Sequence, residues 1–586
     1  MNQRLSNRRI RLLLGLFVLV FAGTLARAVW IQGVQASRFE GMAERQHQGT
    51  TVIPAGRGTI FDRTGEPLAI GEQATTEIPA GRGTIFDRSG EPLAIGEQAT
   101  TIYADPRRVR NPRRVALAAA KALGVDAERL YPLLADRSRH FVYVKRKADP
   151  AQAAELERQD LAGLGFYAEE LRSYPQRSVA SHVLGYAGLD NEGLEGLERS
   201  LDRNLRGQPG TQTTVADPAG RVIDVVSTRP ERPGADVFLT LDRRVQANAE
   251  AVLRETVERW GAKGGNAIVL DPRTGAVLAM AVAPTYDANS FGAASPARRR
   301  NRAVTDVYEP GSTFKVVTVA AALSEKIVTP TTPFTLPSSI RVADRIIHEH
   351  EPRPTRRMTV AQILSQSSNV GTITLAQMLA RTRVESWIDR FGFGKRTGVD
   401  APGESPGLLP SYWSGSTIGN VPIGQGIGVT PIQMATAYAA IANGGVLRTP
   451  YLVDRVGTRR LDHGRGRRVI SRTVSAQMMA MLRDVVSAEG GTGAAAAVSG
   501  YTVAGKTGTA AKPVPGGYST TKYVASFVGV VPAKSPRLVV LVSIDEPRGA
   551  IWGGVVAAPA FAEIARSSLV ELEVAPDSAT GPTTSR

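Results

Sequence analysis

One apolar segment near the N-terminus limits the chain to a short list of architectures. Residues 12–31 are apolar except for Arg27, and about 20 such residues cross a bilayer as a helix. Arg27 would reach the outer interface beside Trp30, while the arginines before the segment stay in the cytoplasm by the positive-inside rule. We therefore expect a cytoplasmic tail at residues 1–11, a single-pass inner-membrane anchor at residues 12–31, and an extracytoplasmic remainder.

The alternative for this segment is a cleaved signal peptide. That interpretation needs a small-residue cleavage site, and Ala22-Gly23-Thr24 or Ala26-Arg27-Ala28 could serve as one. The length of the apolar segment favours the uncleaved anchor. Both interpretations keep the rest of the chain out of the cytoplasm, so we expect no nucleic-acid partner despite the net charge of +17.

Length and composition indicate a multidomain protein. At 586 residues the chain is longer than one hydrophobic core usually supports, so two or three domains are expected. The chain has no cysteine, which excludes disulfides, thiolate zinc sites and a cysteine nucleophile. Any covalent catalysis must therefore use another side chain.

Two nearly identical segments follow the expected anchor. Ile53–Thr76 and Ile78–Thr101 differ only in having Thr64 in the first copy and Ser89 in the second. Two copies are fewer than the three or more that a repeat fold needs, so we interpret residues 53–101 as a local tandem duplication. Either copy could fill the corresponding place in the fold, and the other would form a surface loop.

The periodicity of the rest predicts two modules. Residues 32–236 combine helical stretches such as Arg113–Leu123 with turns rich in Gly and Pro, which indicates an elongated α+β pedestal. A second domain is expected at residues 237–572, beginning with a short strand and a helix at about Asp242–Trp260. Residues 573–586 are small and polar and are expected to be disordered.

The second domain has strand patterns at both ends and helical patterns between them. The predicted strands are Asn266–Leu270, Ala276–Val282, Tyr501–Thr509, Tyr523–Val531 and Leu538–Ile544, the first two forming a hairpin. The predicted helices are Thr313–Leu323, Val360–Leu379 and Pro431–Asn443. We therefore expect an antiparallel sheet flanked by helices, with a helical lobe inserted between its strands.

Three short motifs lie in order within this domain: Ser312-Thr313-Phe314-Lys315, Ser367-Ser368-Asn369 and Lys506-Thr507-Gly508. The first opens an apolar helix, so Ser312 and Lys315 share one face a single turn apart. An amine among valines can lose its proton and activate the serine. The alternative is a capping serine beside a lysine that reaches the surface.

The other two motifs suit the handling of a peptide. Ser367 and Asn369 precede a helical segment, where a hydroxyl and an amide can relay a proton and bind a substrate amide. Lys506-Thr507-Gly508 lies in a predicted strand that can pair with an extended peptide, with a cation for a carboxylate and a glycine that lets the ligand approach. Backbone N–H groups of Ser312 and Thr509 would form the oxyanion hole.

Longer segments carry a family resemblance. YEPGSTFK, SQSSNVGT, GQGIGVTPIQMATAYAAIANGG, AGKTGTA and YVASFVGVVP resemble the transpeptidase domain of class B penicillin-binding proteins. RGTIFDRTGEPLA, RSYPQRSVASHVLGYAG and NEGLEGLE resemble the pedestal module of the same family. The Ser-Ser-Asn and Lys-Thr-Gly-Thr forms are most similar to the division-specific FtsI type, and the second RGTIFDR copy departs from the family pattern.

This resemblance implies a serine peptidoglycan D,D-transpeptidase with a penicillin-binding/serine β-lactamase-like fold. Ser312 would attack the penultimate D-alanine of a stem peptide, release the terminal D-alanine, and pass the acyl group to an amine of a neighbouring stem peptide. The implied catalytic residues are Ser312, Lys315, Ser367, Asn369 and Lys506, and the implied substrate-binding or oxyanion residues are Thr507, Gly508 and Thr509. No metal or organic cofactor is needed. β-Lactams would bind as mimics of the D-Ala-D-Ala end, and the implied partners are a membrane glycosyltransferase and cell-division or elongation proteins.

Several alternatives stay open on the sequence alone. An elongation-specific transpeptidase of the same class has the same motifs. A serine β-lactamase shares two of them but needs neither pedestal nor anchor, and a non-catalytic scaffold would be expected to have lost Ser312 or Lys315. His348-Glu349-His350-Glu351 looks like a metal-ligand cluster, but without a matching further ligand we expect a polar loop.

Overall fold

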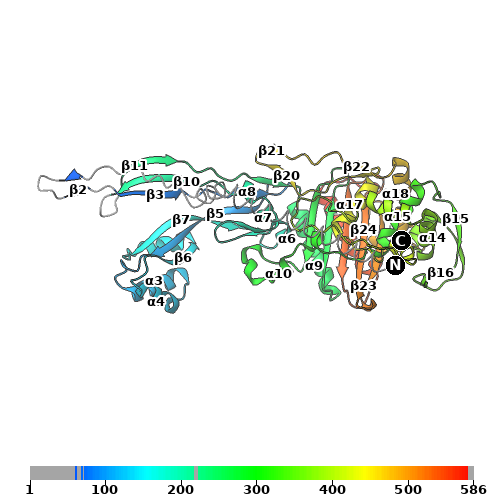
Figure 1. Cartoon of the computed structure of the whole chain (residues 1–586), viewed down its shortest axis with the longest axis horizontal. Helices are drawn as coiled ribbons and strands as arrows, with labels where there is room; N and C mark the ends of the chain where they lie inside the picture. The colour runs from blue at the N-terminus through cyan, green and yellow to red at the C-terminus, as the bar shows by residue number, and fades with distance from the viewer. Residues whose placement is uncertain (1–59, 62–66, 70–71, 79, 217–221, 579–586) are drawn as a thin grey trace, which may run out of the picture. The chain divides into compact units, whose positions relative to one another are not determined.

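The computed structural model describes residues 60–61, 67–69, 72–78, 80–216 and 222–578 (Figure 1). The expected cytoplasmic tail, the expected anchor and most of the first copy of the duplication therefore lie outside the described residues. Among the helices in the described part of the chain, none combines the length and the hydrophobicity needed to cross a bilayer.

Contacts divide the chain into two units. The first comprises the chain up to Glu77 together with residues 211–229, and the second comprises residues 78–210 and 230–586. In the first unit, β3 (Glu72–Ile78), β10 (Gly210–Ala216) and β11 (Val222–Arg229) form a three-stranded sheet in the order β11-β10-β3. All three sequence motifs lie in the second unit.

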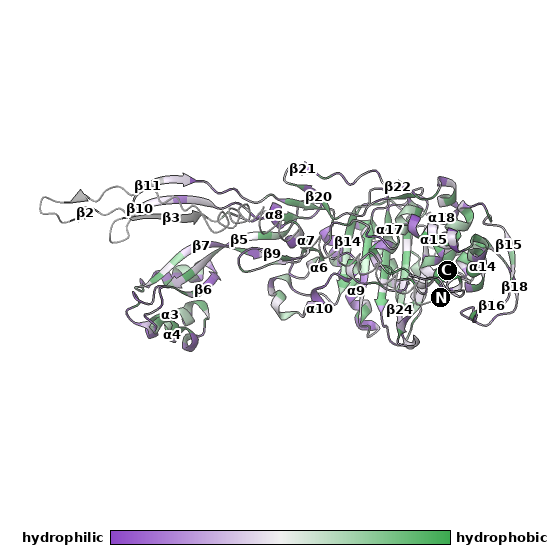
Figure 2. Ribbon diagram, viewed as in Figure 1, coloured by the Kyte–Doolittle hydropathy of each residue, from purple (hydrophilic) through white to green (hydrophobic). Residues whose placement is uncertain are grey.

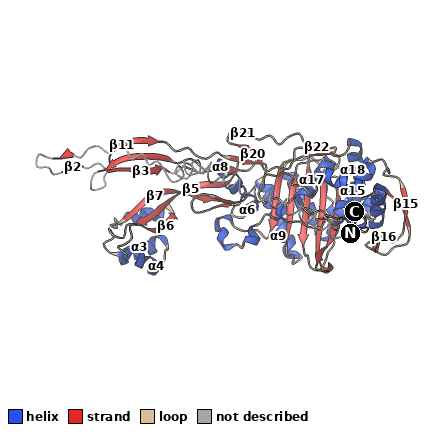
Figure 3. Cartoon of the chain, viewed as in Figure 1, coloured by secondary structure: helices blue, strands red, loops and turns tan. Residues whose placement is uncertain are grey.

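A five-stranded antiparallel sheet forms the centre of the C-terminal half (Figure 3). Its strands are, in order, β14 (Val277–Ala283), β13 (Gly264–Leu270), β25 (Leu538–Asp545), β24 (Gly517–Val531) and β23 (Ala504–Val514). The expected hairpin and the inserted helical lobe are thereby confirmed. The third motif lies on β23, an edge strand in the described sheet, so the outer side of this strand is available for pairing.

The alternation of side chains along each strand gives this sheet two buried faces (Figure 2). Ala267 and Val269 belong to the core shared with α9 (Arg243–Arg259) and α20 (Ala558–Glu571). Ile268 and Leu270 belong to the core of the helical lobe. Because successive side chains on a strand point to opposite faces, β13 reads as continuous apolar sequence and supports both layers.

The lobe between β14 and β23 holds the first two motifs. Its main helices are α12 (Lys315–Ser324), α13 (Val360–Ser365), α14 (Asn369–Leu379), α15 (Arg381–Arg390), α17 (Pro431–Ala442) and α18 (Arg472–Ser487). Nearly every residue of α12 and all of α17 are buried. These two helices are apolar on every side because they lie in the interior between the sheet and the outer helices.

The prediction of one helix over Val360–Leu379 is wrong, because the structure has two. Ser367 between them has φ +58°, in the left-handed region. The Ser368 side chain accepts a hydrogen bond from Gly371 N and so caps the start of α14. A serine that binds nearby backbone competes with helix continuation, which is why the second motif forms a turn.

The strand that carries the third motif also differs from the prediction. β23 begins at Ala504, later than predicted, and continues past Thr509 to Val514.

A second, mixed sheet connects the pedestal to this domain. Its order is β21 (Arg459–Arg460), β20 (Val453–Val456), β12 (Val237–Leu239), β4 (Ile85–Phe86), β5 (Pro92–Ala104) and β6 (Val142–Ala148), with β7 (Leu164–Ser173) also pairing β5. Helix α3 (Pro112–Leu123) packs on the pedestal strands. Asn111 is its N-cap, a proline occupies its first position, and Gly124 at φ +67° caps its C-terminus. These residue types favour a helix start and a helix end at these positions.

The two copies of the duplication form the same hairpin. In the second copy β4 pairs β5 with Ile85 opposite Ala94, and in the first β1 (Ile60–Phe61) pairs β2 (Pro67–Ala69) with Ile60 opposite Ala69. Within the described residues, the second copy continues into the mixed sheet of the pedestal, whereas β3 of the first copy pairs with β10 in the three-stranded sheet. The strand of the second copy runs on into Ile102, which is fully buried, whereas the first copy is followed by Glu77. The two copies therefore differ in the residue that follows them, which is apolar and buried after the second copy and an acid after the first.

The expectation of disorder after the last helix is wrong for its first residues. Val574 is buried, and its carbonyl accepts a hydrogen bond from the Tyr501 hydroxyl at 2.6 Å. The Asp577 carboxylate accepts from Thr502 N at 2.6 Å. One apolar side chain and one acid therefore hold this segment beside the start of β23, and residues 579–586 lie outside the described part.

Candidate active site

The first motif forms a tight turn. Gly311–Phe314 is a 3-10 turn that runs directly into α12, so the α-helix starts at Lys315, two residues later than predicted. Gly311 has φ +53°, and a Cβ added to it would lie 2.9 Å from Thr509 O. Glycine is therefore required here for its backbone conformation and for the close approach of β23. Ser312 is 6% exposed at the start of the helical segment.

Lys315 lies in the centre of the site with no exposed surface. Its Nζ donates to Ser367 O at 2.6 Å, to Asn369 Oδ1 at 2.7 Å and to Ser367 Oγ at 3.3 Å. Burial lowers the pKa of Lys315 to about 7, and the Glu349 carboxylate opposes this shift. The predicted desolvated amine is thus present, and it joins the first motif to the second.

The second motif is held by a residue that the sequence analysis missed. Glu349 accepts hydrogen bonds from the Ser368 hydroxyl and, at 2.8 Å, from Asn369 N, and it pairs with Arg353 at 2.7 Å. The Asn369 side chain also donates to His348 O at 3.0 Å. The run His348–Glu351 is therefore a support for the motif. The described residues contain no cluster of ligands suited to a metal ion.

The third motif faces inward from the edge strand. Lys506 has no exposed surface, and its Nζ donates to Thr507 O at 3.2 Å. Burial lowers its pKa well below the usual value, and the nearby Lys315 adds to the effect. The Thr507 hydroxyl is 2.8 Å from that of Thr492, and the Thr509 hydroxyl accepts from Gly553 N at 3.1 Å.

Gly508 is required for packing. A Cβ on Gly508 would lie 2.4 Å from Ser526 Oγ and 2.9 Å from Pro310 O. The absence of a side chain at Gly508 leaves room for the turn before Ser312, whereas the sequence predicts room for a ligand. Together with Gly311 it brings the backbones at Ser312 and Thr509 next to each other, where the two expected oxyanion donors are needed.

Two aromatic side chains from distant segments meet beside the buried lysines. The His350 ring contacts the Trp552 ring edge-on at 5.3 Å between centroids, and the Trp552 side chain is partly exposed. Partial burial, and then the charges of Lys315 and Lys506, lower the pKa of His350, whose side chain keeps an exposed surface. No local pattern in the sequence indicated this contact.

Family models match most of the described chain. The Penicillin binding protein transpeptidase domain matches residues 265–566, and the Penicillin-binding Protein dimerisation domain matches residues 77–239. The second match begins at Glu77, one residue before the second copy of the duplication.

Individual relatives match over nearly the whole length. The probable peptidoglycan D,D-transpeptidase PenA of Neisseria meningitidis is 34% identical over 97% of this chain and 94% of its own. The peptidoglycan D,D-transpeptidase FtsI of Escherichia coli K12 is 32% identical over 98% of this chain and 93% of its own. The crystal structure of penicillin-binding protein 3 from Mycobacterium tuberculosis with aztreonam superposes with a TM-score of 0.68 at 30% identity, covering 86% of this chain and 98% of that one.

Proposed function

The chain is a class B penicillin-binding protein, a serine-type peptidoglycan D,D-transpeptidase, and we propose that Ser312 is its nucleophile and Lys315 the base that activates it. The observation that carries this proposal is the convergence of the motifs. The Lys315 amine contacts Ser367 and Asn369, and the turn of Ser312 packs against β23 beside Thr509. Residues from three separate segments thus meet in the region of the Ser312 turn.

The first chemical step is acylation. An amine with a pKa of about 7 is about half neutral at pH 7, and its neutral form can accept the Ser312 proton. The Ser312 oxygen then forms an ester with the penultimate D-alanine carbonyl, and the C–N bond to the terminal D-alanine breaks. The leaving amine takes up the proton through Lys315 and the Ser367 hydroxyl. Lys315 and Ser312 share no hydrogen bond in the described structure, and such bonds often form only when substrate binds.

Substrate orientation follows from the edge strand. An extended peptide can pair with the outer side of β23, which places its reacting carbonyl between Ser312 and Thr509. The terminal carboxylate then lies toward Lys506 and Thr507. A carboxylate beside Lys506 would restore the charged form of this buried amine, so recognition of the carboxylate and protonation of Lys506 are coupled.

The second step transfers the acyl group. The ester bond to Ser312 breaks, the amine of a second stem peptide forms an amide with the acyl carbon, and the proton it loses returns to the Ser312 oxygen. β-Lactams stop the enzyme at the ester stage because they enter as mimics of D-Ala-D-Ala. The family binds these drugs, as the aztreonam complex of the mycobacterial relative illustrates.

The decisive test is covalent labelling by a fluorescent penicillin. We expect the Ser312→Ala variant to lose labelling while its unfolding transition is unchanged, because a small hydroxyl without a hydrogen-bond partner in the described structure is removed. Ser324→Ala, whose hydroxyl binds Ala320 O at the far end of α12, is the matched control and should label normally. Labelled peptide from the Ser312→Ala variant would refute the nucleophile assignment.

For the biological setting we propose septal wall synthesis by a protein anchored through residues 12–31. Similarity to FtsI supports the septal role, and the apolar segment supports the anchor. The pedestal at residues 32–236 and the catalytic domain at 237–572 would then lie outside the cytoplasm and contact a membrane glycosyltransferase. Depletion that produces filaments supports division, whereas round cells indicate elongation. Release of the protein from membranes by high salt would refute the anchor.

A further inference from the structure

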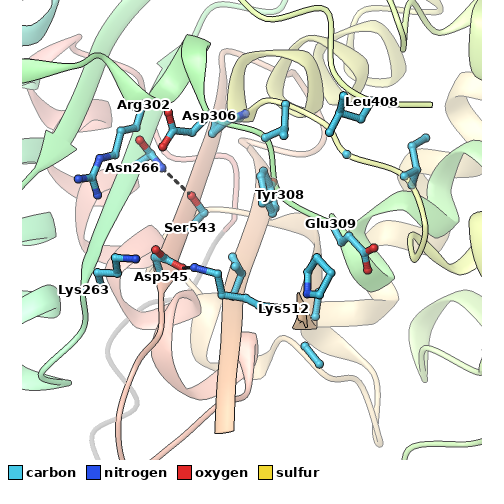
Figure 4. Close-up of a pocket in the computed structure, with 18 of the residues that line it drawn as sticks. Lys263, Asn266, Arg302, Asp306, Tyr308, Glu309, Leu408, Lys512, Ser543 and Asp545 are labelled. Carbon is cyan, nitrogen blue, oxygen red and sulfur yellow. Dashed lines mark hydrogen bonds and ion pairs between the residues drawn. The ribbon is translucent and has the colours of Figure 1, made fainter. Parts of the chain in front are cut away.

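A cavity of about 700 Å³ lies beside the nucleophile turn and takes no part in the chemistry described so far (Figure 4). Its walls are the segment Asp306–Glu309 just before Ser312, the β23 residues Ala510–Pro513 just after Thr509, and the neighbouring strands at Asn266 and Ser543. The Tyr308 ring stands in the middle of the group, between the sheet and the Glu309 side of the cavity. The cavity thus continues the substrate strand in the direction away from Lys506.

Three polar atoms of the lining residues are buried without a hydrogen-bond partner in the described structure. They are Asn266 Oδ1, Tyr308 Oη and Glu309 Oε2. An unsatisfied buried polar group is unfavourable, so three at one cavity are unusual. Rotation about the last torsion of an amide or a carboxylate, which is soft, is enough to turn such an atom toward a ligand. All three atoms can accept a hydrogen bond, and the Tyr308 hydroxyl can also donate one, so a ligand with several donors would satisfy the group.

The cavity is lined by the cations Lys263, Arg300, Arg302 and Lys512 and by the acids Asp306, Glu309 and Asp545. The donor is therefore indicated by how the acids are paired and not by the overall charge. Asp306 pairs with Arg300 at 2.9 Å and Asp545 pairs with Lys512 at 2.7 Å. Glu309 has no cationic partner in the described structure and accepts only neutral donors, Gly426 N at 2.9 Å and the Tyr518 hydroxyl at 3.1 Å. Burial raises the pKa of this carboxyl. A cationic amine would relieve that cost.

The direction of the substrate strand identifies the amine. With its carboxylate toward Lys506 and its reacting carbonyl at Thr509, a donor peptide extends upstream past Ala510 and Ala511 at about 3.3 Å per residue. The acceptor, in contrast, must enter where D-alanine left, toward Lys506. Since the amine that accepts the acyl group belongs to a residue of every stem peptide, an uncross-linked donor carries the same amine upstream of its D-Ala-D-Ala end.

We propose that this cavity binds the cationic amine of the donor stem peptide, with Glu309 as its carboxylate partner and Asn266 and the Tyr308 hydroxyl as further acceptors. The proposal rests on the function proposed above. It makes Glu309 a specificity residue for donors that still have a free amine. Such donors are stem peptides that have not yet been cross-linked through that amine.

The test compares two synthetic stem-peptide donors that differ only in whether the upstream amine is free or acetylated. Wild-type protein should have a kcat/KM for release of D-alanine about tenfold higher with the free amine, the value of one charge-assisted hydrogen bond. Glu309→Gln should remove this preference, Glu309→Asp should keep part of it, and Tyr308→Phe should reduce it to about threefold. Glu385→Gln, which removes an exposed carboxylate on α15, should keep it in full.

The ratio of the two donors cancels general damage to the enzyme, because damage lowers both rates alike. Equal rates for the two donors in wild type, or an unchanged ratio in Glu309→Gln, would overturn the proposal. If Glu309→Gln is inactive with both donors, an unchanged ratio in Tyr308→Phe overturns it instead. A Glu309→Gln effect confined to the acceptor concentration dependence would assign the cavity to the acceptor. Failure of wild type to react with either donor or with penicillin would refute the proposed function itself.

Discussion

Charged side chains are fully buried in two parts of this molecule, and the two parts treat them in opposite ways. In the pedestal, Arg82 and Arg172 each pair with Glu198 at 2.7 Å, and all three side chains are at most 2% exposed. In the catalytic domain Lys315 and Lys506 are buried to the same degree, and neither forms an ion pair in the described structure. Burial alone therefore does not determine what a charge does.

The difference lies in the partners. Burial lowers the pKa of Arg82, but Glu198 and Asp202 outweigh it and hold the guanidinium permanently charged. At Lys315 burial prevails and brings the pKa to about 7. A paired buried charge fixes structure, because removing one partner leaves the other uncompensated. An unpaired buried amine is free to gain and lose a proton, which is the property a catalytic base needs.

The largest expected effect comes from removing the unpaired amine of Lys315. Lys315→Ala should slow acylation of Ser312 by penicillin about 10³-fold or more, since a unit of nucleophile and base fails when the base is removed. The free energy of unfolding should not fall by more than about 1–2 kcal/mol, because the buried amine is itself costly. Stopped-flow labelling and denaturant unfolding measure the two quantities. Lys522→Ala, on the exposed part of β24, is the control. A rate within tenfold of wild type would show that Lys315 is not the base.

For the paired arginine Arg82, the main expected effect is on stability. Arg82→Ala should lower the free energy of unfolding by about 3–5 kcal/mol, because it leaves Glu198 buried beside one remaining arginine. Arg57 is the counterpart of Arg82 in the first copy, and Arg57→Ala should change stability by less than about 0.5 kcal/mol. Urea unfolding measures both variants. Equal losses would mean that both copies use their arginine.

The unpaired lysine should also make the rate of acylation depend on pH. The rate of acylation should rise roughly tenfold per pH unit below about 7 and level off above it, because only the neutral form of Lys315 accepts the proton. Glu349 raises the pKa of Lys315, so Glu349→Gln should move the midpoint to lower pH. Penicillin labelling between pH 5 and 9 records the profile. A flat profile or one that falls with pH would contradict the role of Lys315.

The comparison also shows what the sequence could predict. Ser312, Lys315, Asn369 and Lys506 were predictable because each belongs to a short motif whose residue types carry the chemistry. The strands and buried helices followed from periodicity. Glu349 was not predictable, because its contact with Ser368 and Asn369 joins a polar loop to a turn and leaves no periodic pattern. The reason for a glycine at position 508 was not predictable either, because it arises from the close packing of Ser526 and Pro310.

The duplication could be recognised from sequence, but the choice between its copies could not be made from the repeated residues. Both copies form the same hairpin because that structure is local. What distinguishes them lies just outside the repeat, where Ile102 follows the second copy and Glu77 follows the first. The importance of that one residue becomes clear only in the tertiary packing of the pedestal.

The smallest expected effect tests this conclusion with two deletions of equal length. Deleting Ile53–Glu77 joins Val52 to Ile78 and leaves one copy followed by Ile102, whereas deleting residues 78–102 leaves one copy followed by Glu77. The two products differ only by Ser89 or Thr64 inside the copy and by isoleucine or glutamate after it. We expect the first deletion to change stability by no more than about 1 kcal/mol and penicillin labelling by no more than about twofold. It removes the β1–β2 hairpin and the edge strand β3, but it keeps the copy that is part of the mixed pedestal sheet.

The second deletion supplies the contrast, because it places a glutamate where Ile102 is fully buried in the pedestal core. Burying an unpaired acid and losing an apolar side chain should together lower the free energy of unfolding by about 3 kcal/mol or more. Thermal and urea unfolding of the two proteins measure the difference directly. Equal stabilities would show that Ile102 does not select the copy. A loss of folding in the first deletion would show that the hairpin of β1 and β2, or the strand β3 that follows it, has a structural role of its own.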